Sequence, residues 1–149
     1  MTEIRFYHLS VQSLDQALPK ILSKVLESDR RALVKLTDEE DVRRMNDFLW
    51  TYRPESFLPH GNKKDGHAED QPVFLTDKDE NPNGAQVLVL TGEAVHQDID
   101  KFDLCCEMLN GNDEAAVRAA RKRWKAYKDS GFDVTYWQQT DGGSWEQKA

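Results

Sequence analysis

Two hydrophobic periodicities alternate along the N-terminal part of the chain, and this alternation constrains the fold more than any other feature. Residues 3–9 alternate between apolar and polar positions and are rich in β-branched and aromatic residues, which is typical of a strand. Apolar residues then recur at helical spacing up to Leu26, behind a suitable N-cap at Ser13. The same strand and helix patterns return over residues 31–36 and 38–49. This order predicts parallel pairing through right-handed crossovers, and therefore an α/β fold.

The rest of the chain continues the alternation. Strands are predicted over residues 72–76, 86–90, 102–109 and 132–137, and a long helix from Asp113 to about Ser130, closed by Gly131. The link between the strands at 72–76 and 86–90 is too short for a helical crossover, so these strands either pair antiparallel or are not neighbours. We expect three α/β/α layers around a mostly parallel, mixed sheet. Pro19 lies inside the first helix and predicts a kink or a later start near Gln16.

The composition is that of one soluble domain. The chain has 149 residues, of which 38% are hydrophobic and 32% charged, and no apolar run is long enough to span a membrane. The N-terminus has no signal-peptide pattern, so a cytoplasmic location is expected. We predict a single domain over residues 1–149, with a polar, flexible tail at 138–149.

The adjacent Cys105 and Cys106 are expected to be buried thiols rather than a disulfide or a metal site.

The phosphate-binding motifs of nucleotide-binding α/β proteins are missing. The predicted first strand runs into Ser10-Val11-Gln12-Ser13, without a glycine that would let a phosphate approach the backbone. No Walker motif and no nucleophile elbow occurs anywhere in the chain. The predicted fold is thus Rossmann-like without a nucleotide site, and neither a cofactor nor a metal is expected.

A long loop over residues 52–71 carries the groups that most resemble an enzyme site. His60, His67 and Asp70 could hold a divalent metal or act as acid and base, which would make the protein a metal-dependent hydrolase. Their spacing matches no established metal motif, and a hydrated surface loop is the alternative.

Aromatic and proline residues gather where the second predicted helix runs into this loop. The cluster consists of Trp50, Phe57, Leu58, Pro59 and His60. Aromatic side chains are enriched at protein interfaces. The cluster is therefore either a docking surface or a set of side chains that close one end of the sheet.

The long helix has an asymmetric charge distribution. At ~100° per residue, Ala116, Ala120 and Tyr127 face the sheet, and Val117 and Trp124 lie at the edge of that stripe. The adjoining flank is basic, and it comprises Arg121, Lys128, Lys125, Arg118 and Lys122. No acidic residue occurs between Arg118 and Lys128, although the whole chain has a net charge of −7. Such a face suits an acidic peptide with an apolar anchor. Single-stranded DNA is the alternative ligand, which the overall negative charge disfavours.

These segments, taken in order along the chain, resemble the chi subunit family of bacterial DNA polymerase III. The resemblance is carried by residues 4–9, 49–60, 65–72, 81–84 and 121–132. It implies an α/β/α fold and a non-catalytic replication adaptor, which links the clamp loader to single-stranded DNA-binding protein by binding the acidic C-terminal tail of that protein. It places the tail site at Val117, Arg118, Arg121, Trp124, Lys125 and Lys128. It also implies that Trp50 and residues 57–60 bind the psi subunit where one exists. The chain departs from the family at one position. Where the family can have a basic residue, this chain has Val117, and the basic Arg118 is the next residue.

Overall fold

The computed structural model of the chain describes residues 2–51 and 60–149. The helices are α1 (Leu14–Glu27), α2 (Glu39–Thr51) and α3 (Glu114–Asp129), with short 3-10 segments at Lys63–Asp65, Ala68–Asp70 and Ile99–Lys101. The strands are β1 (Glu3–Leu9), β2 (Ala32–Lys35), β3 (Gly61–Asn62), β4 (Val73–Thr76), β5 (Val87–Thr91), β6 (Leu104–Asn110), β7 (Asp133–Gln139) and β8 (Trp145–Gln147). Among the described residues, no helix combines the length and the apolar character that crossing a membrane requires.

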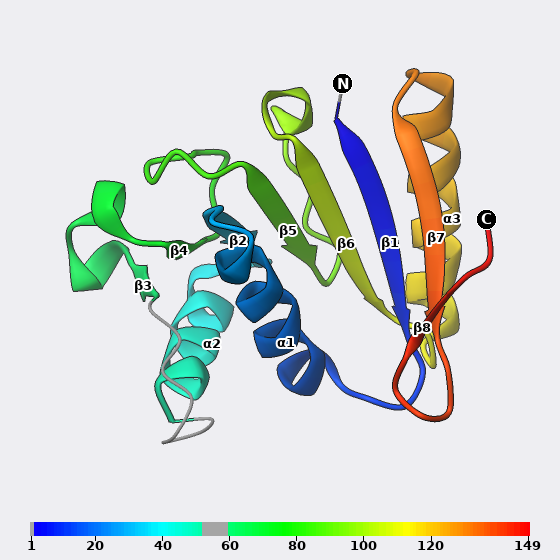
Figure 1. Ribbon diagram of the computed structural model, residues 1–149, viewed down its shortest axis with the longest axis horizontal. Coiled ribbons are helices and arrows are strands. Elements are labelled where there is room, and N and C mark those ends of the chain that lie inside the picture. The colour runs from blue at the N-terminus through cyan, green and yellow to red at the C-terminus, as the bar shows by residue number, and fades with distance from the viewer. Residues whose placement is uncertain (1, 52–59) are drawn as a thin grey trace.

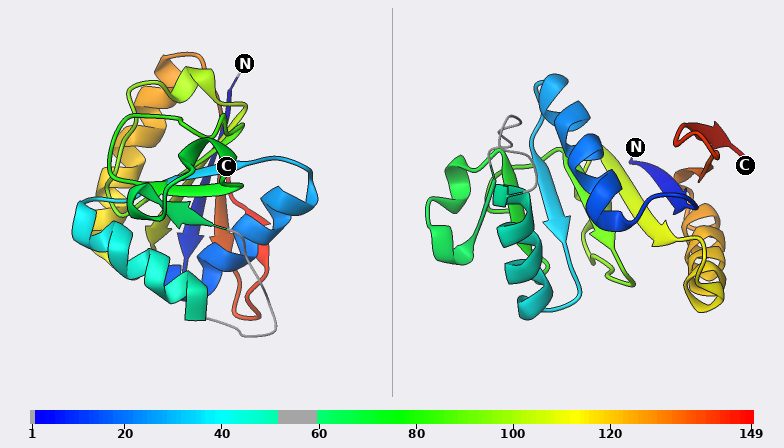
Figure 2. Two further views of the ribbon diagram at one scale, coloured as in Figure 1. Left: turned by 90° about the vertical axis from the view of Figure 1, so that its left-hand side faces the viewer. Right: turned by 90° about the horizontal axis from the view of Figure 1, so that it is seen from below.

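The described strands form one sheet in the order β3-β4-β2-β5-β6-β1-β7-β8. Every neighbouring pair is parallel except β7 and β8, so the predicted mostly parallel, mixed sheet is confirmed. β4 and β5 are not neighbours, because β2 lies between them. Of the two alternatives for strands joined by so short a link, antiparallel pairing or separation in the sheet, the second is therefore correct. Helices α1 and α2 lie on one face of the sheet and α3 on the other, as Figures 1 and 2 show, which confirms the three-layer architecture.

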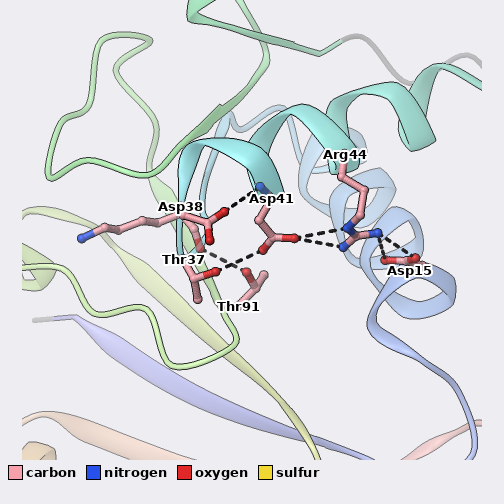
Figure 3. Close-up of polar contacts among 7 residues, drawn as sticks. Asp15, Thr37, Asp38, Asp41, Arg44 and Thr91 are labelled. Carbon is pink, nitrogen blue, oxygen red and sulfur yellow. Dashed lines mark hydrogen bonds and ion pairs between the residues drawn. The ribbon is translucent and has the colours of Figure 1, made fainter.

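The helix starts follow from local capping. The Ser13 side chain accepts a hydrogen bond from the Gln16 backbone N–H, and Gln16 reciprocates, so α1 begins at Leu14 with Pro19 inside it. Asp38 caps α2 by accepting from the Asp41 N–H at 2.7 Å. Figure 3 shows the link between the two helices, in which the Arg44 guanidinium bridges Asp41 on α2 and Asp15 on α1.

Each face of the sheet has its own hydrophobic core. Leu18 and Met45, from α1 and α2, are fully buried against one face. Ala120 of α3 is fully buried against the other. Cys105 and Cys106 point to opposite faces and are both buried and free, as predicted, and burial raises the pKa of the Cys106 thiol to about 12.

The C-terminal residues depart from the prediction of a polar, flexible tail over 138–149. β7 extends to Gln139, and the chain then turns back so that β8 pairs antiparallel with it. Trp145 packs against the first core, with its ring 4.9 Å from that of Tyr7. A strand with one inward-facing aromatic residue is too short to give a recognisable alternation, which is why the sequence pattern missed this hairpin.

Candidate protein-binding site on helix α3

Helix α3 connects β6 to β7 and presents the predicted apolar stripe to the sheet. The Asp113 side chain caps its first turn by accepting from the N–H groups of Ala115 and Ala116, and Gly131, with φ of 91°, follows its C-cap. Half-buried Val117, Trp124 and Tyr127 pack around buried Ala120, as the helical spacing predicted. The opposite face of α3 is left to solvent.

The basic residues of this solvent face are largely without ion-pair partners. Arg118 reaches Glu114 at 3.9 Å, but both side chains are highly exposed. Within the described ranges 2–51 and 60–149, no carboxylate lies at ion-pair distance from Arg121, Lys125 or Lys128. The six residues that the sequence predicted for the tail site all lie on α3, and three of them are cations without an ion-pair partner among the described residues. On a protein with a net charge of −7, these cations give this face of the helix a local positive potential.

Arg123 belongs to the same basic run but points the other way. Its guanidinium contacts Glu107 on β6, which is 1% exposed, and the Tyr127 hydroxyl donates to the same carboxylate at 2.8 Å. Burial raises the pKa of Glu107, and the contacts with Arg123 and Tyr127 oppose that rise. Sequence analysis did not single out this network. The signal was the spacing of Arg123, three residues after Ala120 and four before Tyr127, which places it on the sheet side.

Trp124 combines an apolar surface with two polar features. The Nζ of Lys128 lies 4.6 Å from the centroid of the Trp124 ring, within the range of a cation–π interaction. The indole Nε1 is buried and has no hydrogen-bond partner among the described residues. An unsatisfied buried N–H costs ~1–3 kcal/mol. Because Nε1 has no such partner in the described part of the chain, the Trp124 ring breaks no hydrogen bond if it shifts to receive a ligand.

The second predicted surface is only partly within the described residues. Trp50, at the end of α2, is 48% exposed, which favours a docking surface over a side chain that closes the end of the sheet. Its ring lies 4.3 Å from that of His60, which is 2% exposed and whose Nε2 is 3.1 Å from the Asn46 carbonyl oxygen. Phe57, Leu58 and Pro59 lie outside the described residues.

The predicted enzyme-like loop comes together only in part. His67, Glu69 and Asp70 can each bring a ligand atom within 4.8 Å of the others, and all three are exposed. His60 is not in this group and is held in the interior by its contacts with α2. The sequence predicted a site made from His60, His67 and Asp70. In the structure His67 and Asp70 come together, but His60 does not lie with them.

The loop between β1 and α1 occupies the position at which related folds bind phosphate. The backbone N–H groups of Ser10, Val11 and Gln12 converge on one acceptor, the Oε1 of buried Gln139, at 3.3, 3.1 and 3.0 Å. Three converging N–H groups of this kind can hold an anion. Here a side chain from β7 takes up all three donors, so they are not available to a nucleotide phosphate.

The fold and this geometry define a three-layer α/β/α protein with a mostly parallel sheet. In it, Gln139 occupies the N–H groups of the β1–α1 loop, and α3 exposes a basic face. Comparison with known proteins gives the family. The family model described as "DNA polymerase III chi subunit, HolC" matches residues 1–135, and the chain belongs to that family.

Two relatives show how far the similarity extends. A probable DNA polymerase III subunit chi of Rickettsia prowazekii is 34% identical over 90 residues, which cover 60% of this chain and 54% of that protein. The DNA polymerase III subunit chi of Escherichia coli is 23% identical over 125 residues, 83% of this chain and 84% of that protein. The chain thus spans about half the length of the first relative, and residues 136–149 lie beyond the family match.

Proposed function

We propose that this chain is a non-catalytic replication adaptor that links the polymerase III clamp loader to single-stranded DNA-binding protein. It does so by holding the acidic C-terminal tail of that protein on α3. The observation that carries this proposal is the exposed Arg121, which has no ion-pair partner among the described residues and stands beside the half-buried Trp124. Membership of the chi subunit family supports it.

The charges of the site fit an acidic peptide that ends in a free carboxylate. An arginine guanidinium can bind a carboxylate through two parallel N–H···O bonds, which a lysine cannot do. Lys125 and Lys128 follow Arg121 at one and two helical turns, so an extended acidic segment can run along them. Arg118, already near Glu114, is expected to contribute less than Arg121.

The apolar part of the site fits an aromatic anchor. Val117 and Trp124 lie one helical turn to either side of Ala120 and border the same flank as Arg121. An aromatic residue at the end of the tail could pack on the Trp124 ring while its carboxylate meets Arg121. Such ring pairs contribute ~0.5–1.5 kcal/mol beyond the area they bury.

The net charge of −7 argues for a peptide over nucleic acid. Binding to bare DNA depends on releasing counterions from many phosphates, which an acidic protein does poorly. We therefore expect no appreciable binding to a single-stranded oligonucleotide, even at low salt.

Fluorescence anisotropy with a labelled acidic peptide that ends in a free aromatic residue tests the proposal. The wild type should bind, Arg121→Ala should weaken binding by at least about ten-fold, and an amidated C-terminus should have a similar effect. Lys122→Ala is the matched control, because it removes one charge from the same helix outside the proposed contacts. A wild type that does not bind the peptide, or that binds its amide equally well, would contradict the tail-binding function.

The other half of the adaptor is a contact with the clamp loader, through a psi subunit where one is present. We propose that exposed Trp50 is its anchor, together with Phe57, Leu58, Pro59 and His60. Because His60 is buried, it would act by supporting the Trp50 ring rather than by direct contact. Trp50→Ala should reduce retention on the immobilised partner with little loss of thermal stability, and a large loss of stability would favour a purely structural role.

A further inference from the structure

His8 and Tyr136 form a polar pair on the α3 side of the sheet that the tail-binding proposal does not use. The Nδ1 of His8, on β1, lies 2.7 Å from the Tyr136 hydroxyl on β7, and the two rings are 5.8 Å apart. Both side chains are half-buried. Tyr136 also stacks on Phe6 in the second core, which fixes its ring.

The position of His8 is fixed from its other side by the turn between β6 and α3. A Cβ atom added at Gly111 would lie 2.1 Å from the His8 ring, so the ring sits directly against the glycine backbone. The imidazole is thus held between Gly111 and the Tyr136 hydroxyl. Such double restraint is the kind of preorganisation that a binding group needs.

The same pair lies within the electrostatic reach of Arg121. Burial lowers the pKa of His8, and the Arg121 charge lowers it further. Burial raises the pKa of Tyr136, and the same guanidinium opposes that rise. The groups that face His8 from the packed elements are therefore Arg121 from α3 and Tyr136 from β7, and its β6 neighbour in register is the uncharged Leu109.

We propose that the His8–Tyr136 pair completes the tail site and, beside Arg121, receives the terminal carboxylate of the bound peptide. This inference rests on the proposed function. Neither residue is on α3, so the site extends from the helix onto β1 and β7, and Tyr136 lies just beyond the residues that match the family model.

The hydrogen bond between the two side chains explains how they can bind an anion. When Nδ1 of His8 is unprotonated, it accepts the Tyr136 proton and leaves only oxygen lone pairs toward a ligand. When Nδ1 carries a proton, it donates to the Tyr136 oxygen, and the hydroxyl proton is free to donate to the carboxylate. A protonated His8 adds a second positive charge beside Arg121, so carboxylate binding and His8 protonation favour each other.

Peptide titrations at pH 8 and pH 6 test the inference on the full chain. Tyr136→Phe, which keeps the ring, and His8→Asn should each weaken binding of the free-acid peptide by about three- to ten-fold, and neither should affect the amidated peptide. Wild-type affinity should rise from pH 8 to pH 6, and this rise should vanish in His8→Asn. Lys122→Ala should retain it.

The outcomes distinguish this inference from the tail-binding function on which it rests. If the wild type binds the free acid and Arg121→Ala does not, but both new variants bind like the wild type at both pH values, the tail function stands and the role of the pair is refuted. Equal losses for the free acid and the amide would also refute it, because they would indicate a general structural effect. A wild type that binds neither peptide would overturn the tail function itself.

Discussion

Arg123 on α3 and Glu107 on β6 form a buried ion pair, in which the Arg123 Nε lies 3.0 Å from both carboxylate oxygens. The Arg123 side chain is 15% exposed and that of Glu107 2%. The basic residues of α3 therefore lie in two different environments. Arg123 neutralises a charge inside the fold, whereas Arg121, two residues earlier, faces solvent.

Arg123→Ala should destabilise the protein strongly, because it leaves a buried carboxylate without its cation. Removing one partner of a buried pair costs ~3–5 kcal/mol. Urea unfolding of the variant and the wild type measures the difference. Arg121→Ala is the matched control and should change stability by less than about 0.5 kcal/mol, as surface substitutions do.

The pH dependence of the Arg123→Ala variant gives a second expected outcome. The pKa of Glu107 is raised by burial, and removing Arg123 removes a contact that opposes the rise. A carboxyl whose folded pKa exceeds its unfolded pKa binds more protons when folded, so its contribution to stability is lost as the pH rises through the folded pKa. The variant should therefore be less destabilised at pH 5 than at pH 8. Equal destabilisation at both values would contradict the buried-charge explanation.

The sequence patterns predicted most of the scaffold because helical and strand periodicities are strong where an element buries one face. The capping of α1 by Ser13 and of α2 by Asp38 is local chemistry, and both were recognisable from neighbouring residues. The place of β2 between β4 and β5 was not, because strand order depends on contacts between distant segments.

The site was predictable to the extent that it lies on one helix. The spacing along α3 placed Val117 and Trp124 at the edge of the apolar stripe, and the structure confirms that both pack there. The contact between His8 and Tyr136 could not be predicted, because they are 128 residues apart and meet only through the pairing of β1 with β7. Helical periodicity carries no information about such a contact.

Lys128→Ala should weaken tail binding more than Lys122→Ala, although each change removes one positive charge from α3. The Nζ of Lys128 lies 4.6 Å from the centroid of the Trp124 ring, so its loss removes a positive charge directly beside the proposed anchor surface. We expect a loss of about three-fold or more for Lys128→Ala, and a smaller, salt-dependent loss for Lys122→Ala. Anisotropy titrations at two salt concentrations measure both. Identical losses would mean that net charge alone, rather than this geometry, determines affinity.

The exposed group of His67, Glu69 and Asp70 is expected to bind zinc or manganese only weakly. Its potential ligand atoms come within 4.8 Å of one another, but all three residues are solvent-exposed, and buried His60 cannot join them. Tight sites hold their ligands with supporting hydrogen bonds around the first shell of atoms. Calorimetric titration of metal-free protein should give no saturable heat at micromolar concentrations. Saturable heat that His67→Ala abolishes and His60→Ala retains would instead establish a metal site and revive the hydrolase hypothesis.

Trp145→Ala should destabilise the protein, because Trp145 packs β8 of the C-terminal hairpin against the core. Its ring packs edge-on against Tyr7 and contacts the cluster beneath α1. A fully buried tryptophan contributes ~3–5 kcal/mol relative to alanine, so a half-buried one should contribute roughly half of that. Gln147→Ala, at an exposed position on the same strand, should change the free energy of unfolding little. Urea unfolding compares the three proteins. Equal stability of the wild type and Trp145→Ala would support the flexible tail that the polar composition predicted over residues 138–149.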